Sequence, residues 1–271
     1  VINYYQEVVF GGSRFAGEAA SYLYDIYHEG KIVPKDELKG IEYLRQAAEY
    51  GQECALLKIG KILAEDIDSP YADEIKGIKY LTQAYEAGNV ESAIILAELY
   101  RNGVATVRDL EKSKEYLQFA INKEENPKAL CEMGKLFSHV RHHDWDEDFE
   151  DEQISQEQKI LDQDIAIDYL TRAAEKKYAE AFACLCSIGI DRMYDDDNNL
   201  NEEIAGKVLK WAEGGVELDY PQSILDLAIF YNYGIGTDVD LIKAEKLYLK
   251  ATEAGHKVAP SSLANLYAES F

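Results

Sequence analysis

The sequence predicts an all-α fold: a right-handed superhelix, or solenoid, of helical hairpin repeats. The first observation is that AYEAGNVESAIILAELYRNG (84–103) returns as ATEAGHKVAPSSLANLY (251–267), with glycine, a small residue, leucine, alanine and tyrosine at the same spacing. The second is that the large apolar residues lie three and four positions apart, which is typical of helices. The third is that the pattern returns about every 36 residues, a period typical of repeat folds.

The first half of each repeat, which we call helix A, begins with a small residue. A large apolar residue follows four positions later and is itself followed by a small one. In the third repeat these are Ser92, Leu96 and Ala97. A small residue in the last position lets a neighbouring helix approach closely, so a larger one would overpack the contact. The seven helix A patterns begin at Ala19, Ala55, Ser92, Ala129, Ala181, Ser223 and Ala259.

The second half, helix B, carries a small residue, then an aromatic or apolar residue beside a leucine, and then an alanine. Gly51, Gly88 and Gly255 follow helix B, where a left-handed C-cap is expected. The segment VINYYQEV (1–8) fits the same pattern. The other helix B patterns are GIEYLRQA (40–47), GIKYLTQA (77–84), SKEYLQFA (113–120), AIDYLTRA (166–173), AGKVLKWA (205–212) and AEKLYLKA (244–251).

These patterns predict fourteen helices, seven of each kind, in a single repeat domain over residues 1–271. A lone two-helix unit cannot cover both of its apolar stripes, whereas stacked units bury them against each other. The expected parts are helix B of a partial repeat at 1–12, repeats at 17–51, 52–88, 89–124, 127–177, 179–216 and 221–255, and a terminal helix A at 256–271, with insertions at 139–163 and 191–203.

Composition and charge exclude several kinds of partner. The formal net charge is −23, which opposes binding to nucleic-acid backbones or anionic membrane surfaces, because both need clustered Lys and Arg. No apolar run is long enough to span a bilayer, so we predict no membrane insertion. The four cysteines lack zinc-site spacing, and no Asn-x-Ser/Thr sequon occurs; both favour a reducing, cytoplasmic compartment.

Two segments resemble the Sel-1-like repeat, a relative of the tetratricopeptide repeat. They are LAELYRNGVATVRDLEKSKEYLQFA (96–120) and DLAIFYNYGIGTDVDLIKAEKLYLKATEAG (226–255), the second with a Tyr-x-x-Gly-x-Gly turn at Tyr231, Gly234 and Gly236. The resemblance covers essentially the whole chain outside the insertions. It implies an adaptor or scaffold that binds a protein or peptide partner.

The resemblance also implies that helix A residues line a concave face, and the helix period selects the positions that face it. The selected set includes apolar residues where solvent is expected and basic residues in the groove of an acidic protein. An acidic segment or C-terminal carboxylate would pair with the basic residues, with apolar anchors adding affinity. The alternative is that the basic residues pair with acidic ones across neighbouring repeats. The predicted face comprises Tyr22, Asp25, His28, Lys58, Lys61, Ile95, Glu98, Arg101, Lys135, Asp226, Ile229, Tyr233 and Asn265.

Catalytic and metal-binding patterns are weak or absent in the sequence. No nucleophile–base arrangement and no phosphate loop occurs, so we predict no enzyme activity and no cofactor. His139, His142 and His143 precede the acidic insertion 144–152 and could hold a metal, although a solvated acidic loop is the favoured interpretation. Trp145 and Phe149 could instead pin this insertion to the solenoid or to a partner.

The acidic run DDDNNLNEE (195–203) resembles a calcium loop only in part. It lacks the glycine that such a loop needs, and Gly206 stands where the final glutamate is expected. We interpret it as an inter-helix loop in which Asn201 or a nearby residue caps the next helix.

Two other functions stay open at this point. One is a small-molecule or cell-wall-fragment binding protein with weak hydrolase activity, which needs a closed pocket with convergent polar groups. The other is a spacer within a longer repeat protein. A terminal helix A without its partner would expose an apolar patch, which a second copy could cover in an end-to-end homodimer.

Overall fold

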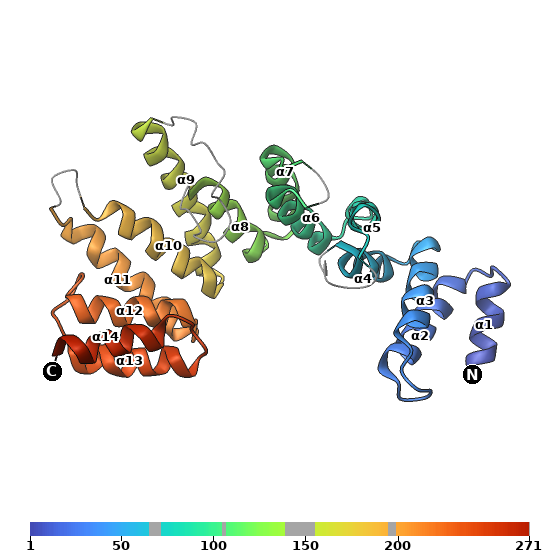
Figure 1. Ribbon diagram of the computed structural model, residues 1–271. Coiled ribbons are helices and arrows are strands. Elements are labelled where there is room, and N and C mark those ends of the chain that lie inside the picture. The colour runs from blue at the N-terminus through green and yellow to red at the C-terminus, as the bar shows by residue number, and fades with distance from the viewer. Residues whose placement is uncertain (65–71, 105–106, 139–154, 195–198, 271) are drawn as a thin grey trace. The chain divides into compact units, whose positions relative to one another are not determined.

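The computed structural model describes residues 1–64, 72–104, 107–138, 155–194 and 199–270 (Figure 1). Within these ranges the chain forms fourteen α-helices and no strand, which confirms the all-α class and the predicted helix count. Odd-numbered helices are helix B and even-numbered ones are helix A. They are α1 (Ile2–Phe10), α2 (Ala16–Glu29), α3 (Glu37–Glu49), α4 (Glu53–Ala64), α5 (Glu74–Glu86), α6 (Val90–Asn102), α7 (Leu110–Glu124), α8 (Pro127–Ser138), α9 (Gln156–Glu175), α10 (Ala179–Arg192), α11 (Glu202–Glu217), α12 (Pro221–Tyr233), α13 (Leu241–Glu253) and α14 (Ala259–Ser270).

The helices gather into two compact units. The first unit, Val1–Glu124, contains α1–α7, and the second, Glu125–Phe271, contains α8–α14. Within each unit every helix A packs most extensively on the helix B that precedes or follows it in the chain. The hairpin is therefore the building block of both units. The single repeat domain over 1–271 stays a prediction.

The small position of helix A faces the leucine of the helix B that follows, as the sequence predicts. A Cβ atom on Gly60 would lie 2.7 Å from the Cγ atom of Leu81, and one on Gly134 would lie 2.6 Å from Cγ of Leu170. Both leucines are fully buried. The absence of a side chain on helix A thus allows helix B to seat its leucine directly against the helix A backbone.

Four of the described hairpins are closed between helix A and helix B by a backbone hydrogen bond and an aspartate cap, which we call the closing turn, and in three of them a lysine also lies over a tyrosine ring. In the third repeat the Asp109 N–H donates to the Tyr100 carbonyl at 2.9 Å, and Asp109 Oδ1 accepts from the Lys112 N–H at 3.0 Å. The aspartate is thus the N-cap of α7. The Lys112 Nζ atom lies 4.9 Å from the centre of the Tyr100 ring, which places a cation over an aromatic face.

The closing turn recurs with the same residue types. Its aspartate and lysine are three positions apart, so a repeated Asp-x-x-Lys pattern marks this turn in the sequence. In the second repeat Leu63 replaces the tyrosine. The other aspartate–lysine pairs are Asp36 and Lys39, Asp73 and Lys76, and Asp240 and Lys243.

The helix B ends confirm the predicted C-caps. Gly51, Gly88 and Gly255 have φ angles of +79°, +94° and +82°, the left-handed region where glycine avoids a steric cost. Lys177 follows the end of α9 and holds a φ of +60° with a full side chain. The prediction for Asn201 is also confirmed, because its Oδ1 accepts from two N–H groups at the start of α11.

Several sequence predictions lie outside the described residues. These are the candidate metal ligands His139, His142 and His143, the anchors Trp145 and Phe149, and the acidic insertion 144–152 that holds them. The end of the predicted 139–163 insertion is helical, because α9 already begins at Gln156. None of the helices in the described ranges has the length and apolar character needed to cross a membrane.

Candidate functional site: the helix A faces

In the first unit, α2 and α4 present a mixed aromatic and polar surface. Tyr22 is 55% exposed, and Asp25, His28 and Lys58 are exposed as well. The Lys58 Nζ atom lies 5.3 Å from the centre of the Tyr24 ring, and the His28 ring stacks on the same Tyr24 ring with 5.1 Å between the ring centres. The contact between Lys58 and Tyr24 joins two consecutive helices A, so these predicted residues share one surface.

An ion pair joins α4 to α6 on the same surface. Lys61 Nζ lies 2.8 Å from Glu91 Oε1, and both side chains are largely exposed. Glu98 and Arg101 are partly exposed on α6, and Arg101 Nε donates to Asn102 Oδ1 at 3.3 Å. Helices α2, α4 and α6 are thus linked one to the next, and each link joins a lysine of the predicted set to a residue outside it, Tyr24 or Glu91.

Ile95 corrects the predicted face. Its side chain is only 3% exposed and packs in a core cluster with Leu96 and Leu99. The reason is that α6 contacts α4, α5 and α7, so a wide part of its circumference is covered. Ile95 is therefore a core residue, and its side chain cannot anchor a partner directly.

In the second unit, Lys135 of α8 is buried among carboxylates. Its side chain is 12% exposed, lies 2.8 Å from Glu132 on the same helix, and also pairs with Glu180 of α10. The Tyr178 hydroxyl donates to Glu180 at 3.3 Å. Burial lowers the pKa of Lys135, but the carboxylates of Glu132 and Glu180 outweigh it and the pKa is raised overall. Lys135 therefore stays charged and is occupied by its own chain, which follows the alternative interpretation of the basic residues.

Buried thiols lie beside this ion-pair cluster. Cys131 of α8 and Cys184 of α10 are in hydrogen-bond contact, which together with burial raises the pKa of the Cys131 thiol. Cys186, two positions after Cys184, points elsewhere and donates to the Val208 carbonyl at 3.6 Å. Cys184 and Cys186 therefore face different neighbours. Both thiol contacts are packing contacts between helices, and none of the four cysteines forms a disulfide.

Asp226 is a second correction to the predicted face. Its side chain is 8% exposed, and its Oδ1 accepts from Gln222 Nε2 at 2.8 Å. Gln222 Oε1 in turn lies 2.9 Å from His256 Nε2. Burial raises the pKa of Asp226 to about 6. The carboxyl is covered because α12 packs against α10 as well as α11 and α13.

The remaining predicted residues of the second unit keep contact with solvent. Ile229 is partly exposed, Tyr233 is 60% exposed, and Asn265 is exposed. In the ranges that the structure describes, no three His, Cys, Asp or Glu side chains form a group that could hold a metal ion. The helix A faces are thus polar and aromatic surfaces with paired charges.

Comparison with known proteins identifies the repeat. Among solved structures, a Sel1 repeat protein from Oxalobacter formigenes matches with a TM-score of 0.68 and 23% identity over 97% of this chain and 68% of that chain. The protective antigen c5321 of uropathogenic Escherichia coli, which displays an SLR fold, matches with a TM-score of 0.51 and 16% identity over 99% of this chain and 60% of that one. At these identities the likeness shows the fold alone. No curated protein matches the sequence.

The family comparison rests on the sequence itself. The Sel1 repeat model matches five segments, which lie in both structural units and together cover more than half of the chain. They are 18–51, 55–89, 90–124, 156–178 and 221–256. Four of these segments coincide with helix pairs of the structure and 156–178 coincides with α9, and the chain belongs to the Sel1 repeat family.

Proposed function

We propose that this protein is a non-catalytic scaffold that binds a protein or peptide partner along the helix A face of its first unit. Sel1 repeat proteins are generally scaffolds for protein interactions, which supports this class of function. The observation that carries the proposal is the continuous row of side chains over α2, α4 and α6. Contacts between Lys58 and Tyr24 and between Lys61 and Glu91 hold the helices of this row together.

The partner of this face carries an acidic segment or a C-terminal carboxylate. Lys58 is exposed and forms no ion pair with any residue in the described ranges, so a carboxylate can reach it without displacing another one. The pair between Lys61 and Glu91 is largely exposed, and such pairs contribute only about 0–1 kcal/mol, so an incoming acid can compete for the lysine. The Tyr22 ring, which is 55% exposed and stacks on Tyr5 of α1, offers an aromatic anchor on α2.

The experiment that tests this function compares two double variants. Lys58→Ala/Arg101→Ala changes the helix A face, and Lys159→Ala/Lys210→Ala removes the same charge from helices α9 and α11. Proteins retained from native lysate are identified by quantitative mass spectrometry, and each one is then produced and titrated by calorimetry. We expect at least one direct partner whose affinity falls about tenfold in the first variant and is unchanged in the second.

Each other outcome of this experiment speaks against the proposal. A direct partner held equally by both variants places the binding site elsewhere. Retention of no protein favours the small-molecule, cell-wall-fragment or spacer alternatives.

An end-to-end homodimer is a further part of this proposal. The outer side of α14 exposes Ala264, Asn265 and Tyr267, a surface on which a second copy could pack. Light scattering over a hundredfold concentration range tests it. A mass of twice 30.6 kDa at high concentration is expected, and a constant monomer mass contradicts the dimer.

A further inference from the structure

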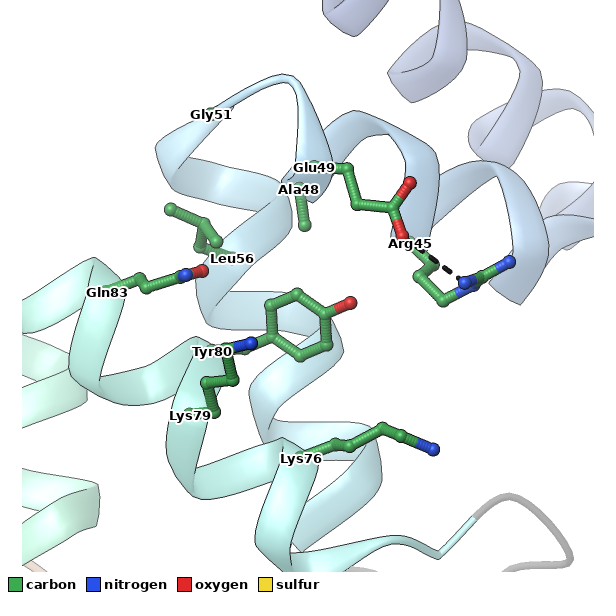
Figure 2. A pocket seen from close by; sticks show the side chains of 9 residues that line it. All are labelled: Arg45, Ala48, Glu49, Gly51, Leu56, Lys76, Lys79, Tyr80 and Gln83. Carbon is green, nitrogen blue, oxygen red and sulfur yellow. Dashed lines mark hydrogen bonds and ion pairs between the residues drawn. The ribbon is translucent and has the colours of Figure 1, made fainter.

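A pocket of about 790 Å³ lies between the helices B of two consecutive repeats, α3 and α5. Figure 2 shows Tyr80 of α5 projecting between the two helices, with its hydroxyl directed toward Arg45 and Glu49 of α3. This volume falls within the range typical of ligand pockets in proteins. The pocket is separate from the helix A face, because its walls come mainly from helix B residues.

The inner wall of the pocket is apolar. Ala48 and Leu56 are buried and belong to the core cluster of the first unit, and the Tyr80 ring is partly buried against the same cluster. Burial raises the pKa of the Tyr80 hydroxyl, and Glu49 raises it further. The hydroxyl is therefore a hydrogen-bond donor at neutral pH, held at the edge of an apolar surface.

Cations surround this apolar wall, although the protein as a whole carries a net charge of −23. Arg45, Lys76 and Lys79 line the pocket, together with a single carboxylate, that of Glu49. Lys79 is exposed and forms no ion pair with any residue that the structure describes. An anion in the pocket would therefore pair with Lys79 without displacing a carboxylate of the protein.

The other two cations are held by exposed carboxylates. Arg45 Nη1 lies 3.2 Å from Glu49 Oε1, and both side chains are about half exposed. Its Nη2 atom lies 2.7 Å from Glu42, while Lys76 pairs with its capping Asp73 at 2.6 Å. An exposed pair such as Arg45–Glu49 contributes little free energy, so Arg45 can turn part of its donor set toward a ligand while it keeps Glu42.

We propose that this pocket binds a carboxylate carried next to a large apolar side chain, as at the end of a peptide or in an acidic-aromatic pair within one. The apolar side chain lies against Ala48, Leu56 and the ring of Tyr80. The carboxylate accepts from Lys79, Arg45 and the Tyr80 hydroxyl. The two sources share this chemistry and differ only in whether the carboxylate belongs to the chain terminus or to a side chain. The inference goes beyond the proposed function, since it uses a different surface.

The test is a titration of the full chain, labelled with ¹⁵N and followed by amide NMR shifts. Three probes are used: acetyl-Gly-Phe with a free terminal carboxylate, the same peptide as its C-terminal amide, and acetyl-Asp-Phe amide. We expect saturable shifts at Ala48, Lys79 and Tyr80 with the first or the third probe, and none with acetyl-Gly-Phe amide. If only acetyl-Gly-Phe binds, the carboxylate that the pocket recognises is that of a chain terminus. If acetyl-Asp-Phe amide binds, the pocket recognises the carboxylate of an acidic side chain.

Variants distinguish binding of the probe in the pocket from nonspecific attraction of its carboxylate to exposed lysines. Lys79→Ala is expected to weaken binding of the carboxylate probe about fivefold to tenfold. Lys246→Ala is the matched control, because Lys246 holds the same helix B position on α13, is exposed and has no ion pair among the described residues. Tyr80→Phe keeps the ring and removes the donor, so a smaller loss is expected.

Three results would overturn the proposal that this pocket binds a carboxylate. They are equal binding of the free acid and the amide, equal losses in Lys79→Ala and Lys246→Ala, and an absence of shifts at millimolar probe. The Lys58→Ala/Arg101→Ala variant keeps this pocket intact. Normal probe binding by that variant, together with loss of its protein partner, distinguishes failure of one proposal from failure of the other.

Discussion

Lys135 and Glu180 occupy the same repeat positions as Lys61 and Glu91, and in both cases the ion pair joins two consecutive helices A. The environments differ. The Lys135 side chain is 12% exposed, that of Glu180 is 33% exposed and the buried Glu132 lies beside them, whereas Lys61 is 40% exposed. The chain therefore contains one interaction in two settings, which makes it possible to measure what burial adds to it.

Lys135→Ala is expected to reduce the free energy of unfolding of the second unit by about 3–5 kcal/mol, because it removes the cation that lies 2.8 Å from the buried carboxylate of Glu132. Lys61→Ala, the matched exposed case, is expected to cost about 0–1 kcal/mol. Urea unfolding of both variants, followed by circular dichroism, measures the difference. Equal losses would contradict the role assigned to burial.

Asp226→Asn is expected to stabilise the protein at pH 8 by up to about 3 kcal/mol. The pKa of Asp226 is about 6 in the folded state, against an ordinary value of 3.8, and a pKa difference of about 2 corresponds to about 3 kcal/mol. Between pH 3.8 and about pH 6 the folded state binds more protons than the unfolded state, so the free energy of unfolding falls as the pH rises through this range. Near pH 4 the substitution should have little effect.

The measurement for Asp226→Asn is the urea midpoint at pH 4 and at pH 8. Asp25→Asn removes the same charge from an exposed position of a helix A, so it serves as the control and should show no comparable pH dependence. A gain for Asp226→Asn that is the same at both pH values would rule out the carboxyl as its source.

Lys177→Gly is expected to raise the thermal midpoint, since Lys177 holds a φ of +60° in the position where α3, α5 and α13 are followed by Gly51, Gly88 and Gly255. A non-glycine side chain in the left-handed region costs about 1–2 kcal/mol of stability. Glycine avoids this cost, but its greater conformational freedom in the unfolded chain offsets part of the gain. Lys210→Gly, in the middle of α11, should instead destabilise by about 1 kcal/mol. Differential scanning calorimetry of the two variants should therefore give shifts of opposite sign.

Gly60→Ala is expected to destabilise the first unit by about 1–3 kcal/mol, because the new Cβ would lie 2.7 Å from Leu81 Cγ. Gly206→Ala is the control within a helix: its Cβ would meet nothing within 4 Å, and alanine favours helices by about 1 kcal/mol over glycine. Circular-dichroism melts measure both. If Gly60→Ala melted like the native protein, the close approach of α4 and α5 would not be a requirement of the hairpin.

The hairpins could be predicted from the sequence because their determinants are local. The three- and four-residue spacing identified the helices, and Gly51, Gly88 and Gly255 identified their ends. The predictions for Ile95 and Asp226 were wrong about exposure because the pattern of one repeat contains no information on the next helix A. Burial at these positions depends on α4 and α10, which stack beside α6 and α12.

The specific partners Glu91 and Glu180 were missed for a related reason. Glu180 follows Lys135 at a distance of more than one repeat, so their pairing depends on how repeats stack. A signal was present in the sequence: Lys61 with Glu91 and Lys135 with Glu180 recur at equivalent repeat positions. The Asp-x-x-Lys sequences before helix B were a second unused signal, and they mark the closing turns.

The closing turn has a consequence for how such a chain can evolve. All of its contacts, from Tyr100 to Asp109 and Lys112, lie within one repeat. A tandem duplication of a whole repeat therefore copies a complete hairpin together with its closing turn. A deletion of a whole repeat removes one hairpin and leaves the helix caps of the neighbouring repeats in place. Arrays of different lengths can arise in single genetic events, while the surface residues of each new copy remain free to diverge toward another partner.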